Sequence, residues 1–284
     1  MVIDAHHHLW RYDPARYPWI TDAMSVLKRD FLLREFAAER EANRIDASVA
    51  VQADPSESET LFLLNLAEHN HHVAGVVGWV DLRSPQTESR LQFFSEFQKL
   101  RGFRHIAQAE PDDRFLMQPE FVRGVSLLQR FDFTYDLLIY PKQLPAAIEL
   151  VSRLPEQSFV LDHAAKPFIQ SAALDPWAAH IKTLAQNPNV FCKLSGLVTE
   201  ADWHNWQPAH FHPYLDVLFE SFGPDRLMFG SDWPVCLVAA SYAQVKQLVE
   251  DYVDARASQH KEKIFAANAI RFYGLKAAQH GFAA

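Results

Sequence analysis

Short apolar runs alternate with amphipathic segments along the whole chain. Runs rich in β-branched residues predict buried strands, and apolar residues spaced three and four apart, such as Leu61, Leu64 and Ala67, predict helices. The predicted strands are residues 2–5, 47–51, 73–80, 102–105, 133–138, 159–162, 190–194 and 226–230. Strands that alternate with helices in this way predict an α/β fold, a single (β/α)8 barrel domain over residues 1–284.

An open, doubly wound sheet is the alternative fold. The chain has only nine glycines, and no glycine-rich phosphate loop follows any predicted strand, so the barrel is favoured. One connection stands apart, the aromatic and proline-rich segment 11–34 after the first strand. It is interpreted equally well as a loop that contributes to the active site and as a plug over the barrel end.

Ionisable residues gather where three of the predicted strands end. The first strand runs into His6, His7 and His8, the strand 159–162 is followed by His163, and the strand 226–230 is followed by Asp232. Side chains alternate along a strand, so His6 and His8 share one face and His7 points the other way. Parallel barrels build their active sites at the C-terminal ends of the strands. We therefore expect a site at this end of the barrel.

This residue set supports two chemistries, and the residues alone leave both open. His6, His8, His163 and Asp232 are suitable ligands for one divalent ion, most readily zinc. Without a metal, Asp232 acts as a general base toward water and the histidines hydrogen-bond a substrate carbonyl. The strand 102–105 has no lysine that could be carbamylated to bridge two metals, which argues against a binuclear site.

Further polar and aromatic residues lie near the same strand ends. Arg104 presents fixed charged donors to an oxygen-rich substrate. The candidate substrate-binding residues are Arg104, His105, Asp136, Lys166 and Trp10. Lys193 and Ser195 share a strand face and are weaker candidates.

Composition narrows the class of protein. Hydrophobic residues make up 49% of the chain, and the net charge of −8 argues against nucleic acid or an anionic membrane as a partner. No apolar stretch is long enough to span a bilayer, and the early first strand leaves no room for a signal peptide. Cys192 and Cys236 are expected to be free thiols. We expect a cytoplasmic enzyme with a small-molecule substrate, its oligomeric state left open.

Several strings together resemble the amidohydrolase superfamily. The sequence is most similar to its amidohydrolase 2 branch, in particular to sugar lactonases of the L-fuconolactonase and L-rhamnonolactonase type. The strings that carry the resemblance are Asp4-Ala5-His6-His7-His8-Leu9-Trp10, Gly102-Phe103-Arg104-His105, Leu161-Asp162-His163-Ala164-Ala165-Lys166-Pro167, Cys192-Lys193-Leu194-Ser195-Gly196 and Gly230-Ser231-Asp232-Trp233-Pro234.

The resemblance implies hydrolysis of a sugar lactone to an aldonic acid. Asp232 would be the base that activates water, and His6, His8 and His163 would surround the carbonyl and hold one metal if a metal is used. Arg104 would stabilise the oxyanion or bind hydroxyls. Some lactonases of this branch work without metal, so no cofactor is obligatory. The alternatives are a zinc-dependent decarboxylase of the same branch and a barrel that binds a sugar acid without turning it over.

Overall fold

Eight parallel strands form one sheet whose spatial order follows the sequence, from β1 to β8. The computed structural model describes residues 1–276, so residues 277–284 of the predicted domain lie outside the described part. The strands are β1 (Ile3–His7), β2 (Ala47–Val51), β3 (Val73–Gly78), β4 (Leu100–His105), β5 (Thr134–Leu137), β6 (Phe159–Leu161), β7 (Val190–Leu194) and β8 (Leu227–Phe229). The predicted (β/α)8 barrel is confirmed.

Predicted and observed strands differ only at their ends. The predicted strand 73–80 stops at Gly78 because the next backbone N–H, that of Trp79, donates to Thr60 Oγ1 at 2.7 Å instead of to a neighbouring strand. The first strand extends beyond its predicted end and includes His6 and His7. His6 and His7 therefore belong to β1, and His8 follows it directly.

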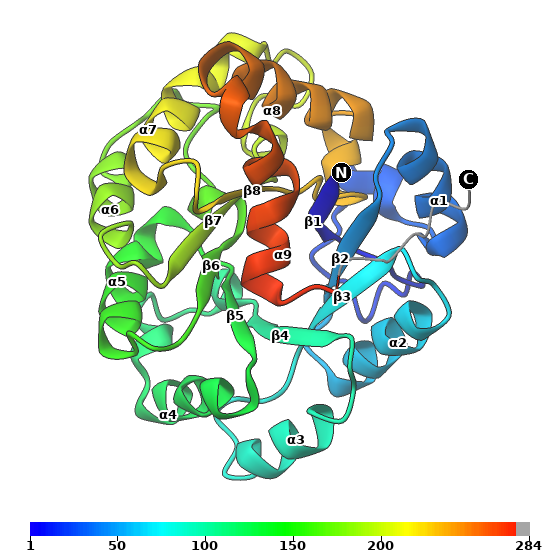
Figure 1. Ribbon diagram of the computed structural model, residues 1–284, viewed down its shortest axis with the longest axis vertical. Helices are drawn as coiled ribbons and strands as arrows, with labels where there is room; N and C mark the ends of the chain where they lie inside the picture. Colours follow the sequence, from blue (N-terminus) through cyan, green and yellow to red (C-terminus); the bar gives the residue numbers. More distant parts are fainter. Residues whose placement is uncertain (277–284) are drawn as a thin grey trace.

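Helices surround the barrel on the outside, and one short helix lies across the barrel in the view of Figure 1. They are α1 (Leu33–Ala42), α2 (Glu57–Glu68), α3 (Thr87–Phe94), α4 (Pro119–Leu128), α5 (Leu144–Arg153), α6 (Trp177–Leu184), α7 (His212–Phe222), α8 (Tyr242–Arg256) and α9 (Asn268–Tyr273). Within the described residues, none is long and apolar enough to cross a membrane. Cys192 and Cys236 are buried free thiols, as predicted.

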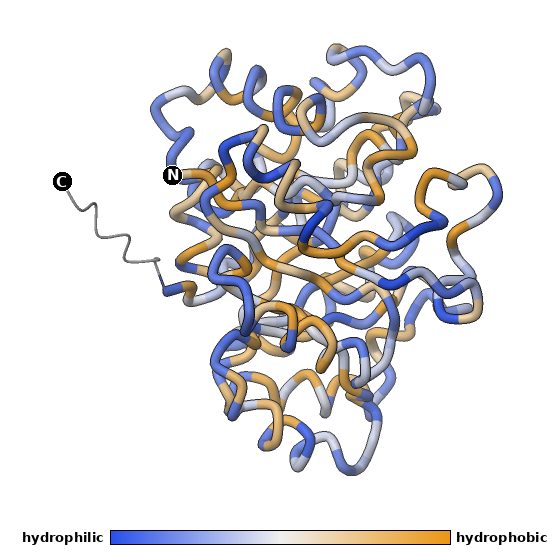
Figure 2. Tube along the Cα trace, turned by 90° about the vertical axis from the view of Figure 1, so that its right-hand side faces the viewer, coloured by the Kyte–Doolittle hydropathy of each residue, from blue (hydrophilic) through white to orange (hydrophobic). Residues whose placement is uncertain are grey.

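The barrel interior is apolar at the end that α9 covers. Inward side chains such as Val49, Val77 and Val160 pack in one cluster with Ala269 and Phe272 of α9. Figure 2 shows the same division, with hydrophobic segments through the middle of the molecule and hydrophilic segments on the outer turns. The apolar plug leaves the opposite end of the barrel for chemistry.

Two segments from opposite ends of the described chain meet where the barrel closes. The backbone N–H of Asp232 donates to His6 O at 2.8 Å, and that of His8 donates to Trp233 O at 2.6 Å. These bonds continue the sheet from β8 to β1. They also bring the predicted base next to two of the predicted histidines.

The segment 11–34 folds back over this junction. Trp10 and Phe31 exchange two backbone hydrogen bonds, and the rings of Tyr17, Trp19 and Phe31 lie within 6 Å of the Trp10 ring. This packing agrees with the interpretation of the segment as a plug. Trp10 itself is fully buried, and its indole N–H donates to Arg29 O at 3.0 Å.

Candidate active site

His6 and His8 point together because β1 is irregular. Ile3 and Ala5 face the inner apolar cluster, so strict alternation would turn His6 outward. The pairing of β1 with β2 shifts between Asp4 and His7, which resets the alternation. His7 then faces outward, where its ring stacks on Phe36 at 3.9 Å.

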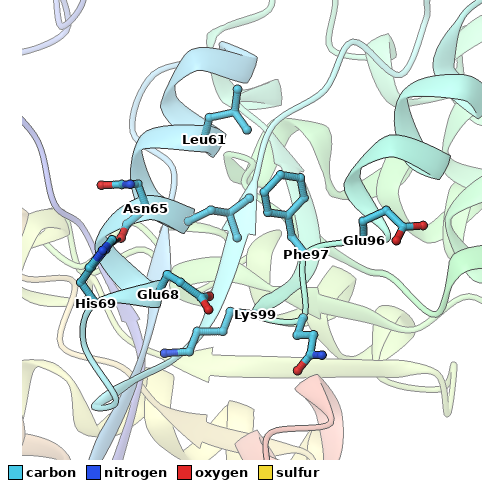
Figure 3. Close-up of a pocket in the computed structure, with 9 residues that line it drawn as sticks. Leu61, Asn65, Glu68, His69, Glu96, Phe97 and Lys99 are labelled. Atoms are coloured by element: carbon cyan, nitrogen blue, oxygen red, sulfur yellow. Dashed lines mark hydrogen bonds between the residues drawn. The ribbon is translucent and has the colours of Figure 1, made fainter.

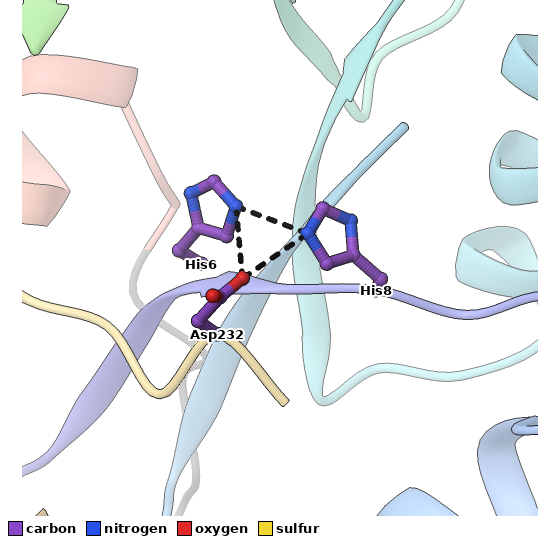
Figure 4. A group of neighbouring side chains, drawn as sticks. All are labelled: His6, His8 and Asp232. Carbon is purple, nitrogen blue, oxygen red and sulfur yellow. Dashed lines mark hydrogen bonds and ion pairs between the residues drawn. The ribbon is translucent and has the colours of Figure 1, made fainter. Parts of the chain in front are cut away.

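Four predicted residues converge at the C-terminal end of the barrel. Figure 4 shows His6, His8 and Asp232 pointing at one another. The Nε2 atoms of His6 and His8 are 3.2 Å apart. Asp232 Oδ1 lies 3.4 Å from His8 Nε2, 3.7 Å from His163 Nε2 and 3.8 Å from His6 Nε2. One carboxylate oxygen is thus surrounded by three imidazole nitrogens.

Each imidazole ring is oriented through its other nitrogen. His8 Nδ1 donates to Val51 O at 2.7 Å, which leaves Nε2 without a proton in the neutral ring. His163 Nδ1 lies 2.9 Å from Ser195 Oγ. Contacts of this kind fix ring orientation in metal and catalytic sites.

Left-handed backbone turns carry two of the four residues. Asp232 has φ of 56°, and the residues from His163 to Lys166 all have φ between 51° and 57°, although none is glycine. Such conformations are unfavourable and occur where surrounding structure enforces them, often at active sites. The indole N–H of Trp177 helps here by donating to Ala164 O at 2.7 Å.

Gly196 makes room for the ring of His163, and Gly230 makes room for the start of the His6 side chain. A Cβ atom on Gly196 would lie 2.5 Å from His163 Nδ1, and one on Gly230 would lie 2.8 Å from His6 Cβ. Both distances are shorter than any carbon side chain tolerates, so each position requires glycine.

The four converging residues His6, His8, His163 and Asp232 form the centre of the site, and burial keeps its imidazoles neutral. Burial lowers the pKa of His163 to about 4 and the pKa of His8 below its usual value, and burial together with nearby Lys193 holds the pKa of His6 well below it. Burial alone would raise the pKa of Asp232, but His163, His8 and Lys166 outweigh it and lower that pKa. At neutral pH the centre is one carboxylate among neutral rings.

A buried ion cluster lies directly behind His6. Lys193 Nζ is 3.0 Å from His6 Nδ1, 2.9 Å from Asp162 Oδ1 and 2.5 Å from Asp136 Oδ2. Arg104 Nη1 donates to Asp162 Oδ2 at 3.0 Å and lies 3.3 Å from His6 Nε2. Arg104, which was predicted to bind substrate, therefore lies next to the centre.

Asp136, also predicted to bind substrate, is occupied inside this cluster. It pairs with Lys193 and accepts a 2.8 Å hydrogen bond from the hydroxyl of Tyr273, which comes from α9. Its carboxylate is fully buried. The geometry makes Asp136 a counter-ion of Lys193 and gives it no contact with the converging atoms of the centre.

The other predicted binding residues lie at different depths. His105 faces the wall of the barrel, where its Nε2 is 2.7 Å from Glu110 Oε1 and its ring stacks on Phe115. Trp10 is part of the aromatic plug described above. Lys166 lies at the rim and pairs with Glu200 at 3.7 Å. Of these three, the structure brings only Lys166 beside the centre.

Sequence patterns missed Asp162 as a site residue. Its signal was its position immediately before His163 at the end of a buried run. Burial raises the pKa of Asp162, but Lys193, His6 and Arg104 reverse the effect and hold it well below the usual value. Asp162 is thus an anion that aligns both Arg104 and His6.

A surface cavity of about 650 Å³ lies elsewhere on the molecule, between α2 and the start of β4. Leu61, Glu68, Phe97 and Lys99 are among its lining residues (Figure 3). Lys99 Nζ already donates to Ala67 O and Asn70 O. No residue of the converging set lines this cavity, which belongs to the outer helix layer.

Three of the converging donors, from His6, His8 and Asp232, fit a single zinc ion. Tetrahedral zinc with bonds of about 2.0–2.1 Å separates its ligand atoms by roughly 3.3 Å. The separations among His6 Nε2, His8 Nε2 and Asp232 Oδ1 are 3.2, 3.4 and 3.8 Å, close to this value. Two three-residue groups of the described residues meet the geometric requirement, His6–His8–Asp232 and His6–Asp162–His163.

Fold and site together define a (β/α)8 barrel whose centre is built from three histidines and one aspartate at the strand ends. A family model described as Amidohydrolase matches residues 3–275. The chain belongs to the amidohydrolase family, as the sequence resemblance predicted.

Named relatives cover almost the whole chain. L-fucono-1,5-lactonase of Burkholderia multivorans is 46% identical over 284 residues, 96% of each chain. L-fucono-1,5-lactonase of Burkholderia ambifaria is 34% identical over 280 residues, 95% of this chain and 94% of the relative. A crystal structure of an amidohydrolase from Burkholderia multivorans with bound zinc superposes with a TM-score of 0.93 at 44% identity, covering 97% of this chain and 100% of the other.

Proposed function

We propose that this protein hydrolyses a sugar lactone of the L-fucono-1,5-lactone type to the open aldonic acid, with Asp232 as general base. The two relatives named L-fucono-1,5-lactonase support the substrate class. The observation that carries the mechanism is the ionised Asp232 carboxylate facing three neutral imidazoles, with Oδ1 within 3.8 Å of each Nε2.

The reaction needs one proton acceptor and one group that stabilises negative charge. Asp232 takes a proton from water as the water oxygen attacks the lactone carbonyl carbon. Arg104 Nη1, beside His6 Nε2, donates to the oxygen that becomes negative. Protonated Asp232 then returns its proton to the ring oxygen as the ester bond breaks, which restores the carboxylate and releases a hydroxy acid.

Zinc is the cofactor that this donor set fits, and a relative's structure holds zinc. His6, His8 and Asp232 would be its ligands in this chain, with His163 Nε2 beside Asp232. When bound, zinc polarises a carbonyl and lowers the pKa of a bound water. The neutral rings and the ionised carboxylate are already in the protonation states that zinc binding requires.

Proton release from a panel of lactones tests the proposal. The panel holds L-fucono-1,5-lactone, L-rhamnono- and L-galactonolactones and unsubstituted δ-valerolactone, each measured with and without a chelator. We expect fast release from L-fucono-1,5-lactone. Release that survives chelation assigns the reaction to Asp232 and the histidines, whereas loss that zinc restores makes the histidines ligands. No release from any lactone contradicts the proposal and favours a decarboxylase or a binding barrel.

A further inference from the structure

An ion pair at the ends of β6 and β7 lies beside the centre without joining it. Lys166 ends the left-handed turn that begins at His163, and Glu200 ends a short 3-10 helix (Val198–Glu200) after β7. Lys166 Nζ and Glu200 Oε1 are 3.7 Å apart, which is longer than a charged hydrogen bond. Their side chains are 17% and 21% exposed, so both remain accessible from solvent.

This pair is close enough to the centre to influence its charges. Lys166 contributes to lowering the pKa of Asp232 and of His163. Burial raises the pKa of Glu200, Lys166 opposes this, and the Asp232 carboxylate raises it further. Lys166 also lies on the same turn as His163, and Ser195, which precedes Glu200 in the connection after β7, lies 2.9 Å from His163 Nδ1. A substrate whose carbonyl lies at Asp232 therefore extends within reach of Lys166 and Glu200.

Local bonds hold Glu200 in place. Thr199 Oγ1, which donates to Gly196 O at 2.8 Å, lies 3.3 Å from Glu200 Oε1, and the backbone N–H of Gln170 donates to Glu200 O at 2.9 Å. The second bond ties the connection after β6 to the connection after β7. Lys166 and Glu200 are thus presented on two joined segments, as a preorganised site requires.

Aromatic surface and open space lie next to the pair. The Lys166 ammonium is 5.4 Å from the ring centre of Tyr140, and Tyr140 and Phe168 are among the exposed large hydrophobic residues. A cavity of about 340 Å³ is lined by Phe168, Glu200 and three neighbouring residues. Aromatic rings beside a few polar groups in such a space are typical of small-molecule sites.

We infer that Lys166 and Glu200 form the subsite that binds ring hydroxyls of the sugar lactone, with Glu200 as a specificity-determining residue. A hydroxyl both accepts and donates a hydrogen bond, so it can accept from Lys166 and donate to Glu200 across the 3.7 Å gap. The pair carries no net charge, which suits a neutral polyhydroxylated ring. This inference rests on the proposed lactonase activity.

The test compares two lactones and three proteins, the wild type and two variants. For wild type, Glu200→Gln and Lys166→Gln, we would measure kcat and KM for L-fucono-1,5-lactone and for δ-valerolactone, which has no hydroxyl to bind. Loss of a hydrogen bond to a charged group corresponds to roughly ten- to a hundred-fold in binding. We expect the ratio of kcat/KM for the two lactones to fall by about tenfold or more, mainly through KM for the sugar lactone.

A matched control exists on α8. Glu250 pairs with Lys246, and these side chains are 23% and 16% exposed, close to the values for the inferred subsite. Glu250→Gln should leave the ratio at the wild-type value. If Glu200→Gln does not fold, Lys166→Gln carries the same test.

The outcomes separate the two proposals. A ratio within twofold of wild type in folded Glu200→Gln and Lys166→Gln overturns the subsite, as does a wild type that does not prefer the hydroxylated lactone. Hydrolysis of neither lactone by wild type instead refutes the lactonase.

Discussion

Two buried charged regions meet at His6 and differ in how their atoms are spaced. In the ion cluster behind it, Lys193 and Arg104 contact Asp136 and Asp162 at 2.5 to 3.0 Å. In the centre in front of it, the imidazole nitrogens and Asp232 Oδ1 are 3.2 to 3.8 Å apart.

This difference separates a mainly structural role from a catalytic one, and only Arg104 takes part in both. Direct charged hydrogen bonds satisfy the cluster within the protein, and pairing is what makes buried charge tolerable. The centre instead presents lone pairs and one carboxylate around a common point, since His8 Nε2 faces Asp232 without a proton. Such an arrangement is completed by a ligand, a water or an ion. The ion cluster fixes the orientation of His6, and His6 takes part in the chemistry of the centre.

The largest expected effect comes from removing the charge of the centre. Asp232→Asn keeps the size of the side chain but cannot take a proton, so we expect kcat for lactone hydrolysis to fall by about a hundred- to ten-thousand-fold. The variant should remain folded, because the ion cluster is untouched. Steady-state kinetics measure kcat, and thermal unfolding shows whether the variant remains folded.

Asp251→Asn on the exposed face of α8 is the control, with wild-type kinetics expected. An Asp232→Asn enzyme with near-normal kcat would remove Asp232 as the base. It would also remove the distinction drawn above between a catalytic centre and a structural ion cluster.

The next effect is on stability and comes from the cluster. Lys193→Met leaves Asp136 and Asp162 buried beside an apolar side chain, and breaking a buried pair typically costs about 3–5 kcal/mol. Denaturant unfolding should show this loss. Lys246→Met, which removes a partly exposed pair with Glu250, should cost no more than about 1 kcal/mol.

Adding Asp136→Asn to Lys193→Met tests whether an unpaired buried carboxylate causes the loss of stability. The double variant should recover part of the lost stability, because one uncompensated carboxylate is gone. A single variant as stable as wild type would mean that the cluster does not hold the barrel interior together.

The sequence predicted the centre far better than the cluster. His6, His8, His163 and Asp232 could be found because each lies at the end of a recognisable apolar strand, and barrel strands end on one face. Even so, the side chains of His6 and His8 point the same way only because the pairing of β1 is irregular. No pattern in the sequence predicts that irregularity.

The cluster depends on contacts across the barrel that no local pattern encodes. Lys193 on β7 meets Asp136 on β5, and Tyr273 reaches the same carboxylate from α9. Asp136 was therefore predicted to bind substrate, although its partners lie inside the protein. The left-handed turn from His163 to Lys166 was equally hidden, because no glycine marks it.

The smallest effect concerns pH and distinguishes the centre's neutral rings from the ion pairs behind them. The pKa of His163 is about 4 in the folded protein, below the value of 6.5 for an unperturbed histidine. Between these values the unfolded chain binds more protons, so His163 makes the free energy of unfolding rise with pH from about 4 to 6.5. The contribution is on the order of 3 kcal/mol.

Denaturant unfolding of metal-free protein at pH 4.5 and 7 measures this slope. His163→Asn should reduce the difference between the two pH values relative to wild type, while exposed His69→Asn should not. The comparison between variant and wild type isolates His163 from the other buried groups, including His7, whose pKa burial lowers to about 3. An unchanged slope in His163→Asn would mean that His163 has the same pKa in the folded and the unfolded chain, so that burial does not keep this ring neutral below its usual pKa.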